Sequence, residues 1–275
     1  MPTLQTYQGV YLWRYVPSLP LSVIFFGLFT IVTSFHCWRL YKTKALFTIP
    51  FIVGGVCEIF GYVTRAAASS NTGSLILYLL PSIFLVIPPL GFAATLYMVY
   101  SRIVCAVHAE DLSPIPMRWA TWIFITGDFT CFMIQGNAAG LLGNENLTLI
   151  ADYIIIAGLI LQIIVFIFFI VCCGIFNKRM RAYAAESCPV IHLPWQSCLN
   201  MLYMTSTAVL VRNIYRIVEF VMQSVNQDGY LVITEWPLYV FDASLMFLLM
   251  VVFYLWYLHG LYCGRRDSSM QLLNR

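Results

Sequence analysis

Residues 149–176 read LIADYIIIAGLILQIIVFIFFIVCCGIF, and this stretch determines the class of fold. It contains one charged residue, Asp152, close to its start. An α-helix needs about 20 mostly apolar residues to cross the hydrocarbon core of a bilayer. A helix that is apolar on every side must be buried in a large core or in lipid. The stretch therefore predicts a transmembrane helix.

Six further runs have the same character and are separated by short polar or basic connectors. Together the spans are Pro17–Trp38, Leu46–Ala67, Leu75–Ser101, Trp119–Leu142, Leu149–Phe176, Gln196–Met222 and Glu235–Gly260. Only 10% of the 275 residues are charged, against about 25% in a typical soluble domain. We predict an all-α, polytopic protein of seven transmembrane helices, with a transmembrane domain at residues 17–260 between a segment 1–16 and a tail 261–275.

Lysine and arginine predict the orientation, because they concentrate in cytoplasmic loops. Alternate connectors and the tail carry eleven of them, and the opposite side carries only Arg14. The N-terminus is therefore expected outside, or in the lumen, and the C-terminus in the cytoplasm. The one glycosylation sequon starts at Asn146, in a connector on the predicted outer side. The net charge of +3 gives no indication of nucleic-acid binding.

Ionisable side chains within the spans are the candidate functional residues, because a charge in the membrane is costly unless it meets a partner or water. The spacing places each set on one helix face. The candidates for a polar, substrate-binding interior are Glu58, Arg65, Asp128, Gln135, Arg212, Arg216, Glu219, Glu235 and Asp242.

Two interpretations of these groups stay open. The charges could form ion pairs that only hold the bundle together, with the three arginines pairing with Glu58, Glu219, Asp128 or Asp242. Glu58–Arg65 and Arg216–Glu219 are the expected pairs. Alternatively, they line a cavity that receives a headgroup or an ion. The acidic groups outnumber the basic ones, which suits a cationic headgroup, and Asp242 and Asp128 are its expected contacts. Pro88-Pro89 in the third span predicts a kinked helix.

The sequence contains none of three common nucleotide-binding and hydrolase motifs. No Walker loop, G-x-G-x-x-G or G-x-S-x-G occurs, so we expect no ATP-driven pumping by this chain alone and no catalytic residue. The four histidines lack a second ligand at metal-site spacing, so no metal or cofactor is expected. They could still converge in space, which leaves a zinc-dependent intramembrane hydrolase as an alternative. They are His36, His108, His192 and His259.

Motifs in all seven spans resemble one family. Around the first span stand Tyr15-x-Pro17-Ser18 and His36, and the second carries Gly54-Gly55-x-x-Glu58-x-x-Gly61-Tyr62-x-x-Arg65. The third span carries Pro89, Ala93-Ala94, Tyr97-Met98 and Arg102. The fourth carries Phe124-x-x-Gly127-Asp128 and Gln135. The fifth carries Gly158-Leu159-x-x-Gln162 and Phe166. The last two carry Arg212-x-x-Tyr215-Arg216-x-x-Glu219 and Glu235-x-x-x-Tyr239-x-Phe241-Asp242. From Tyr15 to His259, their order resembles the fungal RTA-like, or lipid-translocating exporter, family.

The resemblance implies a multi-pass protein of a fungal plasma membrane or endomembrane. It implies export or translocation of lipids or toxic amphiphiles, with sphingoid long-chain bases as model substrates, and resistance to such compounds. The receptor-like topology also allows a membrane sensor that regulates other transporters, which would bind a protein partner at cytoplasmic loops such as Lys178–Pro194. The expected partners are thus the membrane and a lipid or amphiphile. The oligomeric state is not predicted.

Overall fold

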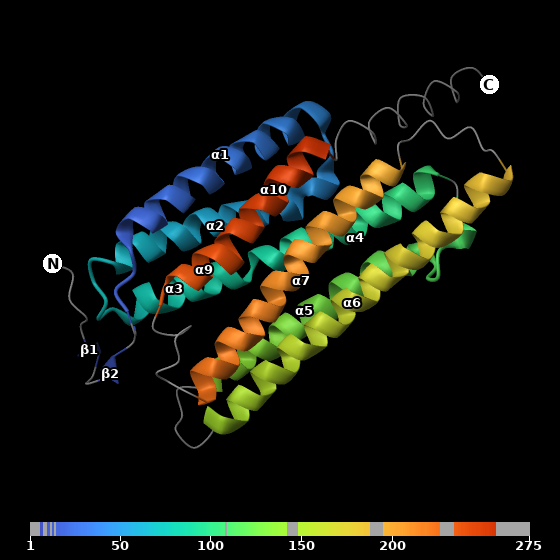
Figure 1. Cartoon of the computed structure of the whole chain (residues 1–275). Helices are drawn as coiled ribbons and strands as arrows, with labels where there is room; N and C mark the ends of the chain where they lie inside the picture. Colours follow the sequence, from blue (N-terminus) through green and yellow to red (C-terminus); the bar gives the residue numbers. More distant parts are fainter. Residues whose placement is uncertain are drawn as a thin grey trace. The chain divides into compact units, whose positions relative to one another are not determined.

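The computed structural model describes residues 6–7, 10–11, 13, 15–107, 109–141, 148–187, 195–225 and 234–256. Asn146, loop residues 188–194 and the tail 261–275 lie outside these ranges. A short antiparallel pair, β1 (Thr6–Tyr7) and β2 (Val10–Tyr11), precedes the helices (Figure 1). The main helices are α1 (Leu19–Thr43), α2 (Ile49–Ala68), α3 (Leu75–Val86), α4 (Pro88–Ala106), α5 (Met117–Leu141), α6 (Thr148–Ser187), α7 (Trp195–Val225) and α10 (Ser244–Trp256).

Shorter helical pieces join or extend these helices. A 3₁₀ turn at Leu46–Thr48 leads into α2, and a second, Glu110–Leu112, follows α4. The last span begins with α9 (Trp236–Leu238) and a π-helical turn (Tyr239–Ala243), which continue into α10. The third predicted span, Leu75–Ser101, corresponds to α3 and most of α4, with a break at Ile87 before the two prolines.

Five helical segments of the described chain are long and apolar enough to cross a membrane: Leu19–Thr43, Leu46–Ala68, Leu75–Ala106, Tyr153–Ala184 and Trp236–Leu255. Helices α5 and α7 complete the seven. α7 is more polar because it carries Arg212, Arg216 and Glu219. The chain is therefore an all-helical, multi-pass membrane protein, and the predicted fold class is confirmed.

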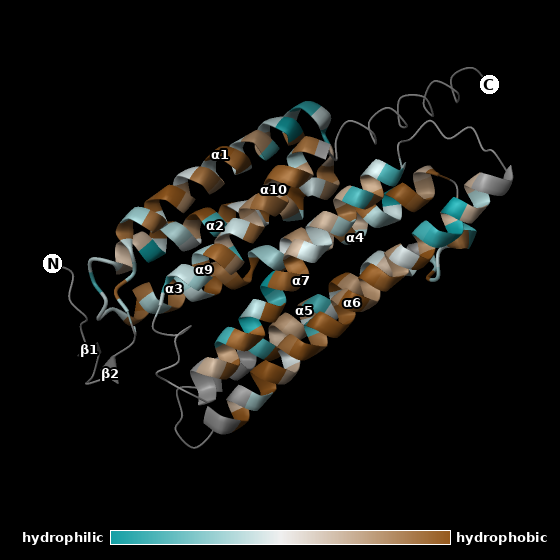
Figure 2. Cartoon of the chain, viewed as in Figure 1, coloured by the Kyte–Doolittle hydropathy of each residue, from teal (hydrophilic) through white to brown (hydrophobic). Residues whose placement is uncertain are grey.

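Hydropathy follows the helices as expected for a lipid-embedded chain (Figure 2). α6 is hydrophobic along most of its length and becomes hydrophilic toward its C-terminal end, where Lys178, Arg179 and Arg181 lie. Its exposed side chains include Ile164 and Phe168. Apolar side chains at such positions face the acyl chains rather than water.

The chain divides into two compact units. The first contains residues 1–92 and 211–248, and the second contains residues 93–210 and 249–275. α5 packs on α6 in the second unit. In the first unit α1 packs on α2, and α2 packs on α3.

Glycines allow α2 to pack closely in the first unit. A Cβ on Gly54 would lie 2.8 Å from the Phe92 ring, and one on Gly61 would lie 2.7 Å from Leu85. Gly91 faces the carbonyl oxygen of Pro50 so closely that a Cβ would overlap it. Small residues permit such backbone approach between membrane helices. These glycines therefore serve helix packing.

Candidate functional site

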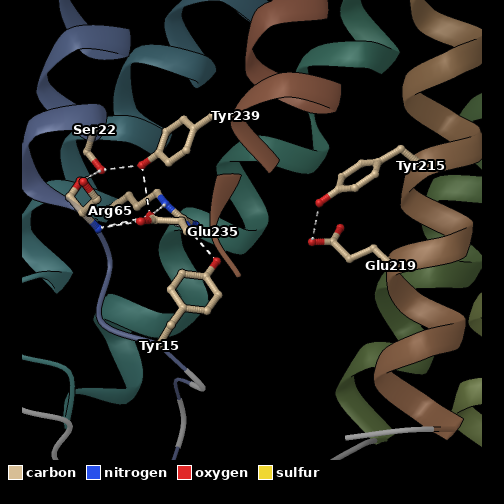
Figure 3. Close-up of polar contacts among 8 residues, drawn as sticks. Tyr15, Ser22, Arg65, Tyr215, Glu219, Glu235 and Tyr239 are labelled. Atoms are coloured by element: carbon tan, nitrogen blue, oxygen red, sulfur yellow. Dashed lines mark hydrogen bonds and ion pairs between the residues drawn. The ribbon is translucent and has the colours of Figure 1, made fainter. Parts of the chain in front are cut away.

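Glu235 is the centre of a polar cluster in the first unit (Figure 3). Its carboxylate accepts hydrogen bonds from the Ser18 backbone N–H at 2.9 Å and from the Tyr239 hydroxyl at 3.1 Å. Arg65 donates to the same carboxylate, with Nη2 at 3.0 Å from Oε1. Arg65 also donates to the Tyr15 hydroxyl at 2.7 Å. The side chains of Arg65 and Glu235 are only 4% and 13% exposed, so this is a buried ion pair.

Local helix geometry explains how this Glu235 cluster assembles. Glu235 and Tyr239 are four residues apart, so both point to one face of the last span. Tyr239 reaches Ser22 of α1, and their hydroxyl oxygens are 3.0 Å apart. Arg65 lies in the last turn of α2. The cluster thus ties the chain before α1 to α2 and to the last span.

Asp242 is the centre of a second cluster, with two arginines from α7. Arg212 donates from Nε to Oδ1 at 2.6 Å, and Arg216 donates from Nη2 to Oδ2. Arg216 also pairs with Glu219, with Nη1 3.1 Å from Oε2. Glu219 in turn accepts from the Tyr215 hydroxyl at 3.3 Å (Figure 3). Both oxygens of Asp242 are therefore occupied by guanidinium groups.

Proline and arginine act together at the break between α3 and α4. In a continuous helix the Leu85 carbonyl would accept a hydrogen bond from residue 89, but Pro89 has no N–H. Arg212 donates to that carbonyl from Nη2 at 2.7 Å. A guanidinium has enough donors to satisfy a carbonyl and a carboxylate together. Arg212 thus stabilises the interrupted helix as well as Asp242.

Glu58 differs from the other acidic residues of the first unit. It is 2% exposed. Within the described chain, this unit has four ion pairs. Arg65 pairs with Glu235, and Arg212 pairs with Asp242. Arg216 pairs with both Asp242 and Glu219. The predicted Glu58–Arg65 pair is therefore wrong, because Arg65 lies near Glu235 instead. The predicted Arg216–Glu219 pair is confirmed.

Among the described residues of the first unit, three arginines form ion pairs with Glu235, Asp242 and Glu219, and none of them forms an ion pair with Glu58. Asp242, Arg212 and Arg216 are the charged groups that act on Glu58 electrostatically. One turn further along α2, the hydroxyl of buried Tyr62 has no hydrogen-bond partner in the described chain. A buried carboxylate without an ion pair of its own is costly, so a proton or a bound cation would stabilise Glu58.

Asp128 and Gln135 belong to the second unit. Asp128 Oδ2 accepts from the Tyr97 hydroxyl at 2.5 Å, whereas its buried Oδ1 has no partner in the described residues. Gln135 donates to Gln162 at 3.3 Å, joining α5 to α6. The other seven candidates, Glu58, Arg65, Arg212, Arg216, Glu219, Glu235 and Asp242, belong to the first unit.

The uncharged residues that form hydrogen bonds with these ionised side chains were not predicted as site residues from the sequence. Tyr15, Ser22, Tyr97 and Tyr239 are neutral, so a search for charged groups passes over them. The available signal was the four-residue spacing of Tyr239 from Glu235. Tyrosine hydroxyls need a partner when buried, and a buried ion offers one.

Metal ligands do not cluster within the described part of the chain, where no group of three His, Cys, Asp or Glu side chains occurs. His36 packs on the Phe51 ring at 4.9 Å between ring centroids. His108, His192 and His259 lie outside the described residues.

A chain whose seven membrane spans are all helical, and whose first unit holds a network of ion pairs, is an integral, multi-pass membrane protein. Residues 51–265 match the family model described as RTA1 like protein. The chain therefore belongs to the RTA1-like family, and the resemblance seen in the sequence is confirmed. No solved structure matches it significantly.

Three relatives from Saccharomyces cerevisiae illustrate the range of the family. Protein RTM1 is 35% identical over 74% of this chain, and the alignment spans 65% of RTM1. Protoporphyrin uptake protein 1 is 32% identical over 90% of this chain and 92% of its own length. Sphingoid long-chain base transporter RSB1 is 24% identical over 92% of this chain and 75% of its own length. The names of the last two refer to uptake of protoporphyrin and to transport of a sphingoid long-chain base.

Proposed function

We propose that this protein translocates or exports lipids or toxic amphiphiles with a cationic headgroup, such as sphingoid long-chain bases. It does so without ATP hydrolysis of its own and without enzymatic catalysis. The observation that carries the proposal is the buried carboxyl of Glu58, which forms no ion pair with the described arginines, beside an otherwise ion-paired interior. A protonated amine would then bind Glu58 in place of the proton that otherwise neutralises this buried carboxyl. The transporter name of RSB1 supports this substrate class.

Glu58 becomes the primary headgroup contact in this proposal. Asp242 was the expected contact, but two arginines already occupy its oxygens. Asp128 remains a proposed contact through its free Oδ1. The ion-paired residues around Glu235 and Asp242 would then hold in place the helices that surround the Glu58 carboxyl.

The test is a scrambling assay with the purified protein in liposomes that contain a fluorescent sphingoid base. Loss of inner-leaflet protection from a quencher reports movement across the bilayer. We expect movement above empty liposomes, and at least a tenfold slower rate for Glu58→Gln. Glu110→Gln, in the turn after α4, is the matched acid-to-amide control and should keep the rate. A folded Glu58→Gln variant with an unchanged rate would contradict the role of Glu58.

A second candidate function is a sensor that regulates other transporters. α6 favours it, because 40 residues extend about 60 Å, roughly twice the hydrocarbon thickness. Arg179 on its basic end donates to the Leu112 carbonyl at 3.2 Å, which anchors the extension to the α4–α5 connector. A specific cytoplasmic partner bound at residues 178–187, with no lipid movement by the folded protein, would support this function over transport.

A further inference from the structure

Two hollows lie next to each other along α1. The first has a volume of about 670 Å³ and is lined by Leu40, Tyr41, Lys42, Lys44 and Leu46, at the C-terminal end of the helix. The second has a volume of about 450 Å³ and is lined by Thr30, Ile31, Ser34, Phe35 and Trp38. Thr30, Ser34, Trp38 and Lys42 are spaced four residues apart, so they lie along one face of the helix. The two hollows are therefore neighbours along this face.

The second hollow is apolar despite its two hydroxyl residues. Thr30 donates to the Phe26 carbonyl and Ser34 donates to the Thr30 carbonyl, each at 2.7 Å. Both hydroxyl protons are therefore used within the helix. The lining that a ligand would contact is therefore apolar, and Ile31, Phe35 and Trp38 contribute to it. From Thr30 to Trp38 the helix rises about 12 Å, close to the depth of one leaflet's hydrocarbon layer.

The first hollow is positively charged. Lys42 and Lys44 are exposed and form no ion pair with any residue that the structure describes. Lys42 Nζ lies 4.1 Å from the centroid of the Trp38 ring, so a side chain of the first hollow contacts a side chain of the second. Tyr41 is 84% exposed, as expected for an aromatic side chain at the membrane interface. Figure 2 shows this end of α1 as hydrophilic, in contrast to the rest of the helix.

The backbone at Lys44 strengthens the case for a functional charge. Lys44 ends α1 in the left-handed conformation, with φ 52° and ψ 30°, and its N–H caps the Leu40 carbonyl at 2.7 Å. Glycine is the usual residue for this cap, because a Cβ is strained there. Among the described non-glycine residues, Lys44 alone has a positive φ. A lysine at this position keeps a charge where glycine would give the more relaxed turn.

We propose that these hollows bind an anionic phospholipid of the cytoplasmic leaflet, with its headgroup at Lys42 and Lys44 and an acyl chain along Thr30–Trp38. The charge asymmetry of the connectors predicts that this end of α1 lies on the cytoplasmic side. Anionic lipids are enriched there and are attracted by lysine and arginine near the membrane. The site is separate from Glu58, because two lysines repel the cationic headgroup of the proposed substrate. It therefore does not depend on the transport function.

The test measures binding of phosphatidylserine and phosphatidylcholine to the full chain in detergent, by native mass spectrometry and thermal unfolding. We expect phosphatidylserine to be retained and to raise the unfolding midpoint more than phosphatidylcholine does. The double variant Lys42→Gln/Lys44→Gly should weaken phosphatidylserine binding about thirtyfold. Arg265→Gln/Arg266→Gln, which neutralises two basic residues of the tail, is the control and should not change it.

A second variant tests the acyl-chain hollow independently of charge. Ser34→Trp fills the hollow on the lipid-facing side of α1 and should lower phosphatidylserine retention although both lysines remain. Glycerophosphoserine, which has the headgroup without acyl chains, should not raise the unfolding midpoint. Equal retention of the two lipids, equal loss in both double variants, or full stabilisation by glycerophosphoserine would each overturn the proposal.

Discussion

Asp242 is the residue whose loss should cost the most stability. The buried Arg212 and the part-buried Arg216 both depend on its buried carboxylate, and removing one partner of a buried pair costs about 3–5 kcal/mol. We expect Asp242→Asn to lower the unfolding midpoint strongly in a detergent melt. Glu219→Gln is the matched control, because its side chain is 21% exposed and pairs within one helix. It should cost about 1 kcal/mol or less. Equal effects of the two variants would contradict the buried pairing.

Tyr97 should matter through its hydroxyl rather than its ring. Tyr97→Phe keeps the contacts with Phe124 and Phe169 but removes the hydrogen bond to Asp128. A buried acceptor left without its donor costs about 1–3 kcal/mol. The measurement is thermal unfolding of Tyr97→Phe alone and in combination with Asp128→Leu. The tyrosine change should cost less in the combined variant, since no carboxylate then needs the donor.

Two glycines give a matched test of packing between elements. A Cβ on Gly91, near the start of α4, meets the Pro50 carbonyl of α2, whereas a Cβ on Gly27 of α1 meets nothing within 4 Å. Gly91→Ala should therefore destabilise by about 1–3 kcal/mol. Gly27→Ala should be neutral or stabilising by up to about 1 kcal/mol, because alanine favours the helix. Similar unfolding midpoints for both variants would show that α2 and α4 are not in close contact.

The helices themselves were largely predictable from the sequence. The span Trp119–Leu142 corresponds to Met117–Leu141, and Gln196–Met222 corresponds to Trp195–Val225, because hydropathy locates a membrane helix well. The extension of α6 to Ser187 was not predicted, since hydropathy reports where apolar residues end and not where helix hydrogen bonds end. The Arg65–Glu235 pair was also missed. These residues are 170 positions apart, and only the packing of α2 near the last span brings them together.

At the scale of the whole molecule, the orientation in the membrane is still a prediction from charge. An N-terminal extension that carries a glycosylation sequon should be modified in microsomes, and the same extension at the C-terminus should not. The background is Asn146→Gln, which removes the native sequon. The measurement is a gel shift that an endoglycosidase reverses. Modification at the C-terminal extension alone would invert the orientation and move the proposed phospholipid site to the other leaflet.

Arg212 joins three separate parts of the first unit at one guanidinium. It belongs to α7, it holds the Leu85 carbonyl at the end of α3, and it holds Asp242 in the π-helical turn of the last span. Any relative sliding of these segments would break charge-assisted hydrogen bonds inside the membrane. They should therefore move as one rigid body during a working cycle. Spin labels on these three segments would keep constant mutual distances with and without substrate, and the hinges of any transport motion would lie outside this trio.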